Sequence, residues 1–149
     1  MIKKIIKMMI IAIGAIVQIA LLVIPWILED LCTKKAGVMH HVYYRKAQYA
    51  NSIFSEGNLI IESMGAVIIA LVFGFILFRA FRRKQTLLLK IETTIGFVLS
   101  IIFPIIAYSE NFRAKLSYPY FLICLAAGVF LQVIFVAGIK IFDGKSRNK

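Results

Sequence analysis

One carboxyl group lies inside a long apolar stretch of this 149-residue sequence and is its strongest candidate for chemistry. Glu62 is the single charged residue between Leu59 and Phe78. If that stretch crosses a membrane, a carboxyl there costs roughly 2.5–3.5 kcal/mol at a helix centre and marks a functional site by default. Glu62 could couple a proton or a cation. It could instead extend to the headgroups or pair with a loop cation such as Arg45.

Small residues follow Glu62 at regular spacing. Ala66, Ala70 and Gly74 recur every four residues after it, which places all four positions on one stripe of a helix. Small residues at this spacing allow another membrane helix to approach closely. We therefore expect Glu62 to face protein rather than lipid, and the three small residues to form a helix contact.

Two amide side chains interrupt other apolar stretches. Gln18 and Gln132 fall at comparable depths, within roughly 5 Å if both helices are centred in the bilayer. A hydrogen bond between them is expected, worth about 0.6 kcal/mol and up to about 1.7 kcal/mol. A substrate-binding role is the alternative. Gly128, four residues before Gln132, predicts a second close helix contact on the same stripe.

Few other side chains suggest catalysis or metal binding. Tyr108 is predicted at a depth similar to Glu62, so the two could form an enzyme site with the histidines of the preceding loop. Those histidines, His40 and His41, are adjacent and would point about 100° apart on a helix, which makes a poor metal site. The two cysteines form no CxxC motif. We assign no catalytic residue and expect neither a metal nor a cofactor.

The composition explains which elements must position these residues. The chain is 61% hydrophobic and 17% charged, with a mean hydropathy of +0.88, whereas soluble domains are about 45–50% apolar and about 25% charged. A helix that crosses the bilayer needs about 20 apolar residues, with about 17 as the lower limit. We predict a single all-α membrane domain over residues 1–149, a four-transmembrane-helix bundle. Its spans are residues 8–28, 59–78, 93–109 and 118–139.

The distribution of basic residues predicts the orientation. Twelve of the 18 lysines and arginines fall at the two termini and in the middle loop, and six fall in the other two loops. Short cytoplasmic segments carry the excess of lysine and arginine, so both termini should be cytoplasmic in a multi-pass plasma-membrane protein. The net charge of +11 is then a topology signal, and we expect no nucleic-acid partner.

The loop over residues 29–57 is the longest connection. Val38, Val42, Tyr49 and Ile53 can share one helical stripe, which predicts an amphipathic helix on the outer surface between the first two spans. Tyrosines and basic residues suit the membrane interface. The candidates for contact with lipid or a partner are Tyr43, Tyr44, Arg45 and Lys46.

These features favour a protein that acts by binding. We expect an accessory, regulatory or immunity-type subunit, packed in the bilayer against another membrane protein, a second copy of itself, or lipid. One alternative is a small proton- or cation-coupled carrier or channel that uses Glu62. Another is a lipid- or quinone-modifying membrane enzyme.

Overall fold

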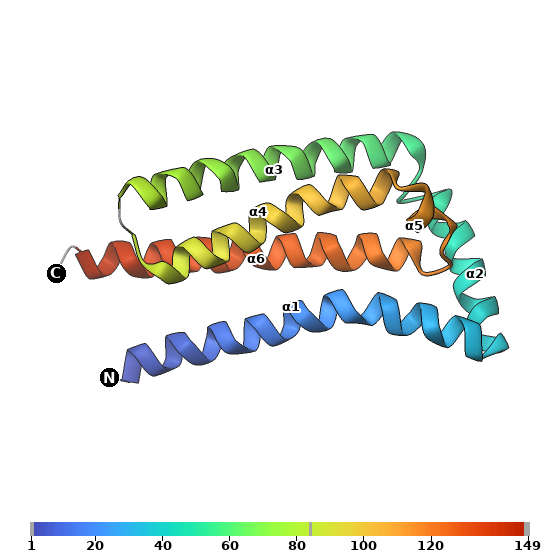
Figure 1. Ribbon diagram of the computed structural model, residues 1–149, viewed down its shortest axis with the longest axis horizontal. Helices are drawn as coiled ribbons and strands as arrows, with labels where there is room; N and C mark the ends of the chain where they lie inside the picture. Colours follow the sequence, from blue (N-terminus) through green and yellow to red (C-terminus); the bar gives the residue numbers. More distant parts are fainter. Residues whose placement is uncertain (1, 84, 148–149) are drawn as a thin grey trace.

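The chain folds entirely as helices in a computed structural model (Figure 1). The structure describes the backbone of residues 2–83 and 85–147 and the side chains of residues 9, 12–83 and 85–141. Within that part no strand occurs. The helices are α1 (Ile2–Lys34), α2 (Ala36–Ala50), α3 (Glu56–Arg82), α4 (Leu87–Tyr108), α5 (Glu110–Ala114) and α6 (Tyr118–Arg147).

Four of the helices are long and apolar enough to cross a membrane. These candidate spans are Ala12–Lys34, Glu56–Arg82, Leu87–Tyr108 and Tyr118–Ile141. The prediction of an all-α, multi-pass membrane protein is confirmed at this level. A helix satisfies its own backbone hydrogen bonds, which is the condition for crossing lipid.

The four long helices run lengthwise together, with α3 and α1 at the two outer edges and α4 crossing α6 between them, and we call this arrangement the open row (Figure 1). Over the described residues α3 packs against α4, α4 against α6 and α6 against α1, whereas the backbones of α1 and α3 are not adjacent. We expected a four-helix bundle of these spans. The row arises because α6, the last helix of the chain, lies between α4 and α1.

Both termini lie at one end of the row, and the short helices lie at the other (Figure 1). We call the latter the loop end, formed by α2, α5 and the segments that flank them (residues 35–55 and 109–117). The side of the membrane that the loop end faces is predicted from the distribution of basic residues alone. Several of the cations in that distribution lie outside the described side chains: Lys3, Lys4, Lys7, Lys84, Lys145, Arg147 and Lys149.

The third span is longer than the sequence suggested. We expected it to begin at residue 93, but α4 begins at Leu87. The middle loop therefore shortens to residues 83–86. As a consequence Glu92 is a buried residue of α4, with 8% of its surface exposed.

Two other helices approach Gly96 of α4 closely. A Cβ atom built there would lie 2.7 Å from Cγ of Gln132 on α6 and 2.8 Å from Cζ of Phe73 on α3. Only a residue without a side chain allows both neighbours to come so near. Gly96 thus sets the spacing of three adjacent helices in the row.

Candidate functional site

A buried polar network joins three helices in the half of the row nearer the termini. The amide nitrogen of Gln18 on α1 donates to the amide oxygen of Gln132 on α6. The amide nitrogen of Gln132 in turn donates to the carboxylate of Glu92 on α4, at 2.6 Å, and to the Glu92 carbonyl. The hydrogen bond expected between the two glutamines is present. Because both amide hydrogens of Gln132 are used, its NH₂ group has none left to offer a substrate.

The small-residue stripe on α3 packs inside the chain. Ala66 and Ala70 are buried, and a Cβ atom at Gly74 would lie 3.3 Å from the Phe97 ring of α4. On α6, Gly128 is also buried, and its Cβ position lies 3.7 Å from Leu99 of α4. The small residues of α3 and α6 therefore pack against α4 of the same chain.

Glu62 is half-buried on α3. The ion pair with Arg45 that we considered for it is not formed. The Oε2 atom of Glu62 is buried without a hydrogen-bond partner. Arg45, the cation considered for it, instead donates to the Gln48 side chain at 2.9 Å. Among the described side chains no ion pair reaches Glu62. An unpartnered carboxyl inside a candidate membrane span is a candidate functional group.

Of the residues considered for an enzyme site, Glu62 and Tyr108 both lie within electrostatic reach of Tyr118. Tyr108 is exposed at the end of α4, where the Arg113 guanidinium lies 5.6 Å from its ring. His40 and His41 are both exposed on α2. None of these residues lines the pocket described below, and Glu62 does not either. Within the described residues no group of three histidine, cysteine or acidic side chains could hold a metal ion.

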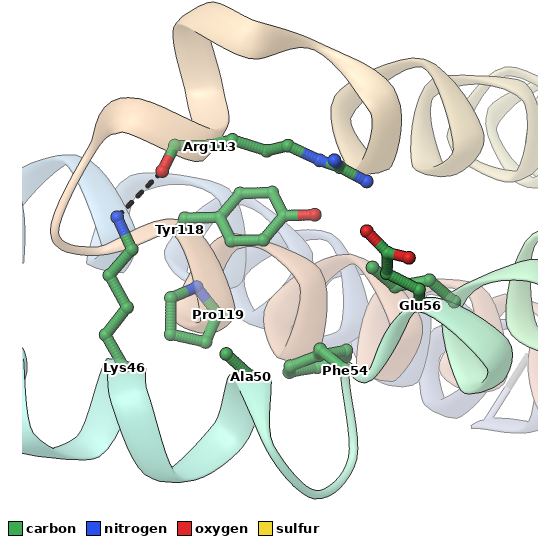
Figure 2. Close-up of a pocket in the computed structure, with 8 residues that line it drawn as sticks. Lys46, Ala50, Phe54, Glu56, Arg113, Tyr118 and Pro119 are labelled. Atoms are coloured by element: carbon green, nitrogen blue, oxygen red, sulfur yellow. Dashed lines mark hydrogen bonds between the residues drawn. The ribbon is translucent and has the colours of Figure 1, made fainter.

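A pocket with a volume of about 220 Å³ lies at the loop end, where α2, α3 and the start of α6 meet (Figure 2). Basic, acidic, phenolic and apolar side chains all contribute to its walls. We call it the loop-end pocket, and it is lined by Lys46, Ala50, Phe54, Glu56, Leu59, Arg113, Tyr118 and Pro119.

Lys46 connects α2 to the segment around Arg113 by hydrogen bonds. Its ammonium group donates to the backbone carbonyl of Arg113 at 2.7 Å (Figure 2). It also donates to the backbone carbonyl of Lys115 at 2.8 Å. Burial lowers the pKa of Lys46, and the nearby carboxylate of Glu29 offsets part of that effect. Lys46 thus makes two hydrogen bonds within the chain, whereas Tyr43 and Tyr44 are exposed.

Arg113 and Tyr118 are held by one carbonyl group. Ala107 lies in the last turn of α4, where carbonyl groups lack helical partners. Its oxygen accepts hydrogen bonds from Nε of Arg113 at 3.0 Å and from the hydroxyl of Tyr118 at 2.7 Å. The rest of the guanidinium extends beside the Tyr118 hydroxyl toward Glu56, so that three polar groups face the same space (Figure 2).

A second set of contacts at the loop end ties α1 to α6. The carboxylate of Glu29 accepts hydrogen bonds from the backbone N–H of Ser117 at 2.9 Å and from its hydroxyl at 2.6 Å. Ser117 immediately precedes α6, so the carboxylate lies where the helix dipole favours negative charge. Nearby, the ammonium of Lys115 lies 4.4 Å from the Trp26 ring centre. These contacts hold the segment that carries Arg113 and Tyr118.

No protein-family model, curated protein or solved structure matches this chain. Its function must therefore be inferred from the site itself. Of the pocket residues, the sequence singled out only Lys46. Glu56, Arg113 and Tyr118 were missed because each lies at the end of an apolar stretch, where polar residues are expected in any membrane protein.

Proposed function

We propose that this chain is a small multi-pass protein of the plasma membrane that acts by binding, as an accessory, regulatory or immunity-type subunit. In this proposal both termini are cytoplasmic. The observation that carries it is the open row, because each edge helix has one side packed and the other side free. Such a row can extend by adding a helix of a partner or of a second copy.

The free side of α3 supports this proposal. Ile61, Ile68 and Phe75 recur every seven residues on the side of α3 away from α4, and each is at least 59% exposed. Large apolar side chains at seven-residue spacing are typical of helices that pack lengthwise against a partner. At the other edge, Ile16 and Val23 are exposed on the side of α1 away from α6.

We also propose that α2 is the amphipathic interfacial helix expected from the sequence. Val42 is 2% exposed and faces the rest of the chain, while Tyr43 and Tyr44 are 62% and 69% exposed. Aromatic side chains of this kind are enriched where lipid meets water. In this arrangement α2 lies across the loop end and presents its tyrosines to headgroups.

Site-specific photo-crosslinking in intact cells tests the subunit function. A photoreactive residue replaces Ile68 or Phe75 at the α3 edge, or Ile16 at the α1 edge. Matched controls carry it at Ile101 and Ile105, which are exposed on the broad face of α4. We expect a discrete protein adduct from at least one edge and lipid adducts from the controls. Lipid adducts alone from both edges would contradict a subunit function.

One observation favours a carrier or channel as the second candidate. The buried, unpartnered Oε2 atom of Glu62 is the kind of group that binds or transfers a proton or cation within a membrane. Under this alternative, Glu62→Gln abolishes ion-coupled flux in proteoliposomes, while the exposed-site control Glu110→Gln leaves it intact. Flux that is equal in the wild-type protein and Glu62→Gln would eliminate this candidate.

A further inference from the structure

The depth of the loop-end pocket restricts what can occupy it. Glu56 and Tyr118 line the pocket and are also the first residues of two candidate spans. A third span ends at Tyr108, close to Arg113 in space. The pocket therefore lies where the chain leaves the hydrocarbon core, which is the level of the lipid headgroups.

Opposite charges face each other across the pocket without pairing. The Arg113 guanidinium enters from one wall and the Glu56 carboxylate from another (Figure 2). No ion pair joins Glu56 to Arg113 or to Lys46 within the described residues. Guanidinium has five N–H donors, and the Ala107 carbonyl takes only the one on Nε. Lys46 donates to two carbonyls and has a third N–H donor. The pocket thus offers separated positions for an anion and a cation.

The remaining walls and the size of the pocket define the shape of the ligand. Four apolar residues complete the lining: Ala50, Phe54, Leu59 and Pro119. The volume of about 220 Å³ is below the roughly 300–1,000 Å³ of pockets that enclose a whole drug-sized molecule. A small polar headgroup fits this space, and the apolar wall can contact the first carbons of an attached chain.

We propose that the loop-end pocket binds the headgroup of a zwitterionic phospholipid that carries a primary ammonium group, the phosphoethanolamine class. The phosphate contacts the guanidinium of Arg113, because guanidinium donors form strong hydrogen bonds to phosphate. The ligand's ammonium donates to Glu56. This site needs the proposed membrane placement but no protein partner, so it can fail or succeed independently of the crosslinking test.

The charges of the pocket distinguish this headgroup from other common ones. A phosphoglycerol headgroup brings a phosphate but no cation, which leaves Glu56 unpaired next to added negative charge. A phosphocholine headgroup brings a quaternary ammonium, which cannot donate a hydrogen bond to Glu56. A primary ammonium satisfies both the charge and the hydrogen-bonding capacity of the carboxylate.

Native mass spectrometry of the full-length protein tests this assignment. The delipidated protein in detergent is titrated separately with dioleoyl phosphatidylethanolamine, phosphatidylcholine and phosphatidylglycerol. We expect one ethanolamine lipid to bind with an apparent Kd about tenfold lower than the other two, a difference of about 1.4 kcal/mol. Equal binding of the three lipids would overturn the proposal. So would equal competition by water-soluble glycerophosphoethanolamine, because the site would then not require a membrane lipid.

Two variants connect the preference to the pocket. Glu56→Gln should lose the roughly tenfold preference for the ethanolamine lipid without weakening binding of the glycerol lipid, because it removes only the carboxylate. Arg113→Gln should weaken binding of all three lipids, and its thermal midpoint confirms that the chain still folds. The matched control is Glu110→Gln, an exposed acid at the same end. An unchanged lipid preference in folded Glu56→Gln would contradict the proposed site.

Discussion

The side-chain amide of Gln132 donates a hydrogen bond to the carboxylate of Glu92 at 2.6 Å, and both residues are buried. They lie 40 residues apart in the sequence and on neighbouring helices of the row. Gln18 extends the same network to α1. A buried carboxylate is tolerated when its hydrogen-bonding capacity is used, so this contact holds α4 and α6 together and makes each residue dependent on the other.

Replacing Gln132 should cost more stability than replacing Gln18. Gln132→Leu removes the donors to Glu92 and leaves a buried acceptor unsatisfied, which costs about 1–3 kcal/mol. Gln18→Leu removes one of the three hydrogen bonds in this network and leaves a single acceptor, Oε1 of Gln132, without its donor. The free energy of unfolding, measured by steric trapping in bicelles, should rank wild type above Gln18→Leu and Gln18→Leu above Gln132→Leu. Val133→Leu, at an exposed neighbouring position, serves as the control. The reverse order of the two glutamine variants would be incompatible with this network.

Gly96→Ala should be strongly destabilising, whereas the same change at Gly65 should not. The added methyl group at Gly96 would lie within 2.9 Å of atoms of Gln132 and Phe73, and overpacking of this kind costs typically about 1–3 kcal/mol. At Gly65 a Cβ atom meets nothing within 4 Å, so helix propensity favours alanine there. Thermal unfolding in one detergent compares the two variants directly. Equal midpoints would show that α3, α4 and α6 are less tightly packed around Gly96 than described.

The hydrogen bonds between Glu29 and Ser117 should appear as a coupling energy between α1 and α6. Glu29→Gln and Ser117→Ala each weaken the same contact, so the double variant should be less destabilised than the sum of the two. Contacting residues of this kind typically couple by about 0.5–3 kcal/mol. A double-mutant cycle on the free energy of unfolding measures the term. Strict additivity would mean that the contact contributes nothing.

Lys46→Gln should loosen the loop end without affecting the centre of the row. The lysine is the donor to the carbonyls of Arg113 and Lys115, and a shorter glutamine side chain cannot reach both. Amide hydrogen exchange should therefore become faster in residues 110–117, while exchange in the middle of α4 stays unchanged. Lys35→Gln is the matched control, since Lys35 is exposed at the same end. Slow exchange in residues 110–117 of Lys46→Gln would show that other contacts hold this segment.

The spans were predictable because their signal is local. Each apolar stretch contains enough residues to cross a bilayer, and no knowledge of its neighbours is needed to recognise it. The predicted third span begins after the first residues of α4, because Lys90 and Glu92 resemble loop residues by composition. In the structure the Glu92 carboxylate finds a donor on α6, and that long-range contact places it inside the helix row.

The candidate site was much less predictable. Glu62 stood out because its charge contrasts with its immediate surroundings. The loop-end pocket has no such contrast, since Lys46, Glu56 and Arg113 come from three segments that are ordinary in isolation. The hydrogen bond from Lys46 to the Arg113 carbonyl joins residues 67 positions apart, and no spacing rule connects them.

The amino-acid sequence by itself determined the number of candidate spans, the helical class and the level at which Gln18 and Gln132 meet. These depend on the lengths and registers of single helices, which apolar composition and the 1.5 Å rise per residue set locally. Only the tertiary structure decided that the helices form an open row, that Glu92 is buried, and that a pocket with opposed charges lies at the loop end. Those features depend on which helices become neighbours, and side-chain packing across the whole chain selects that order.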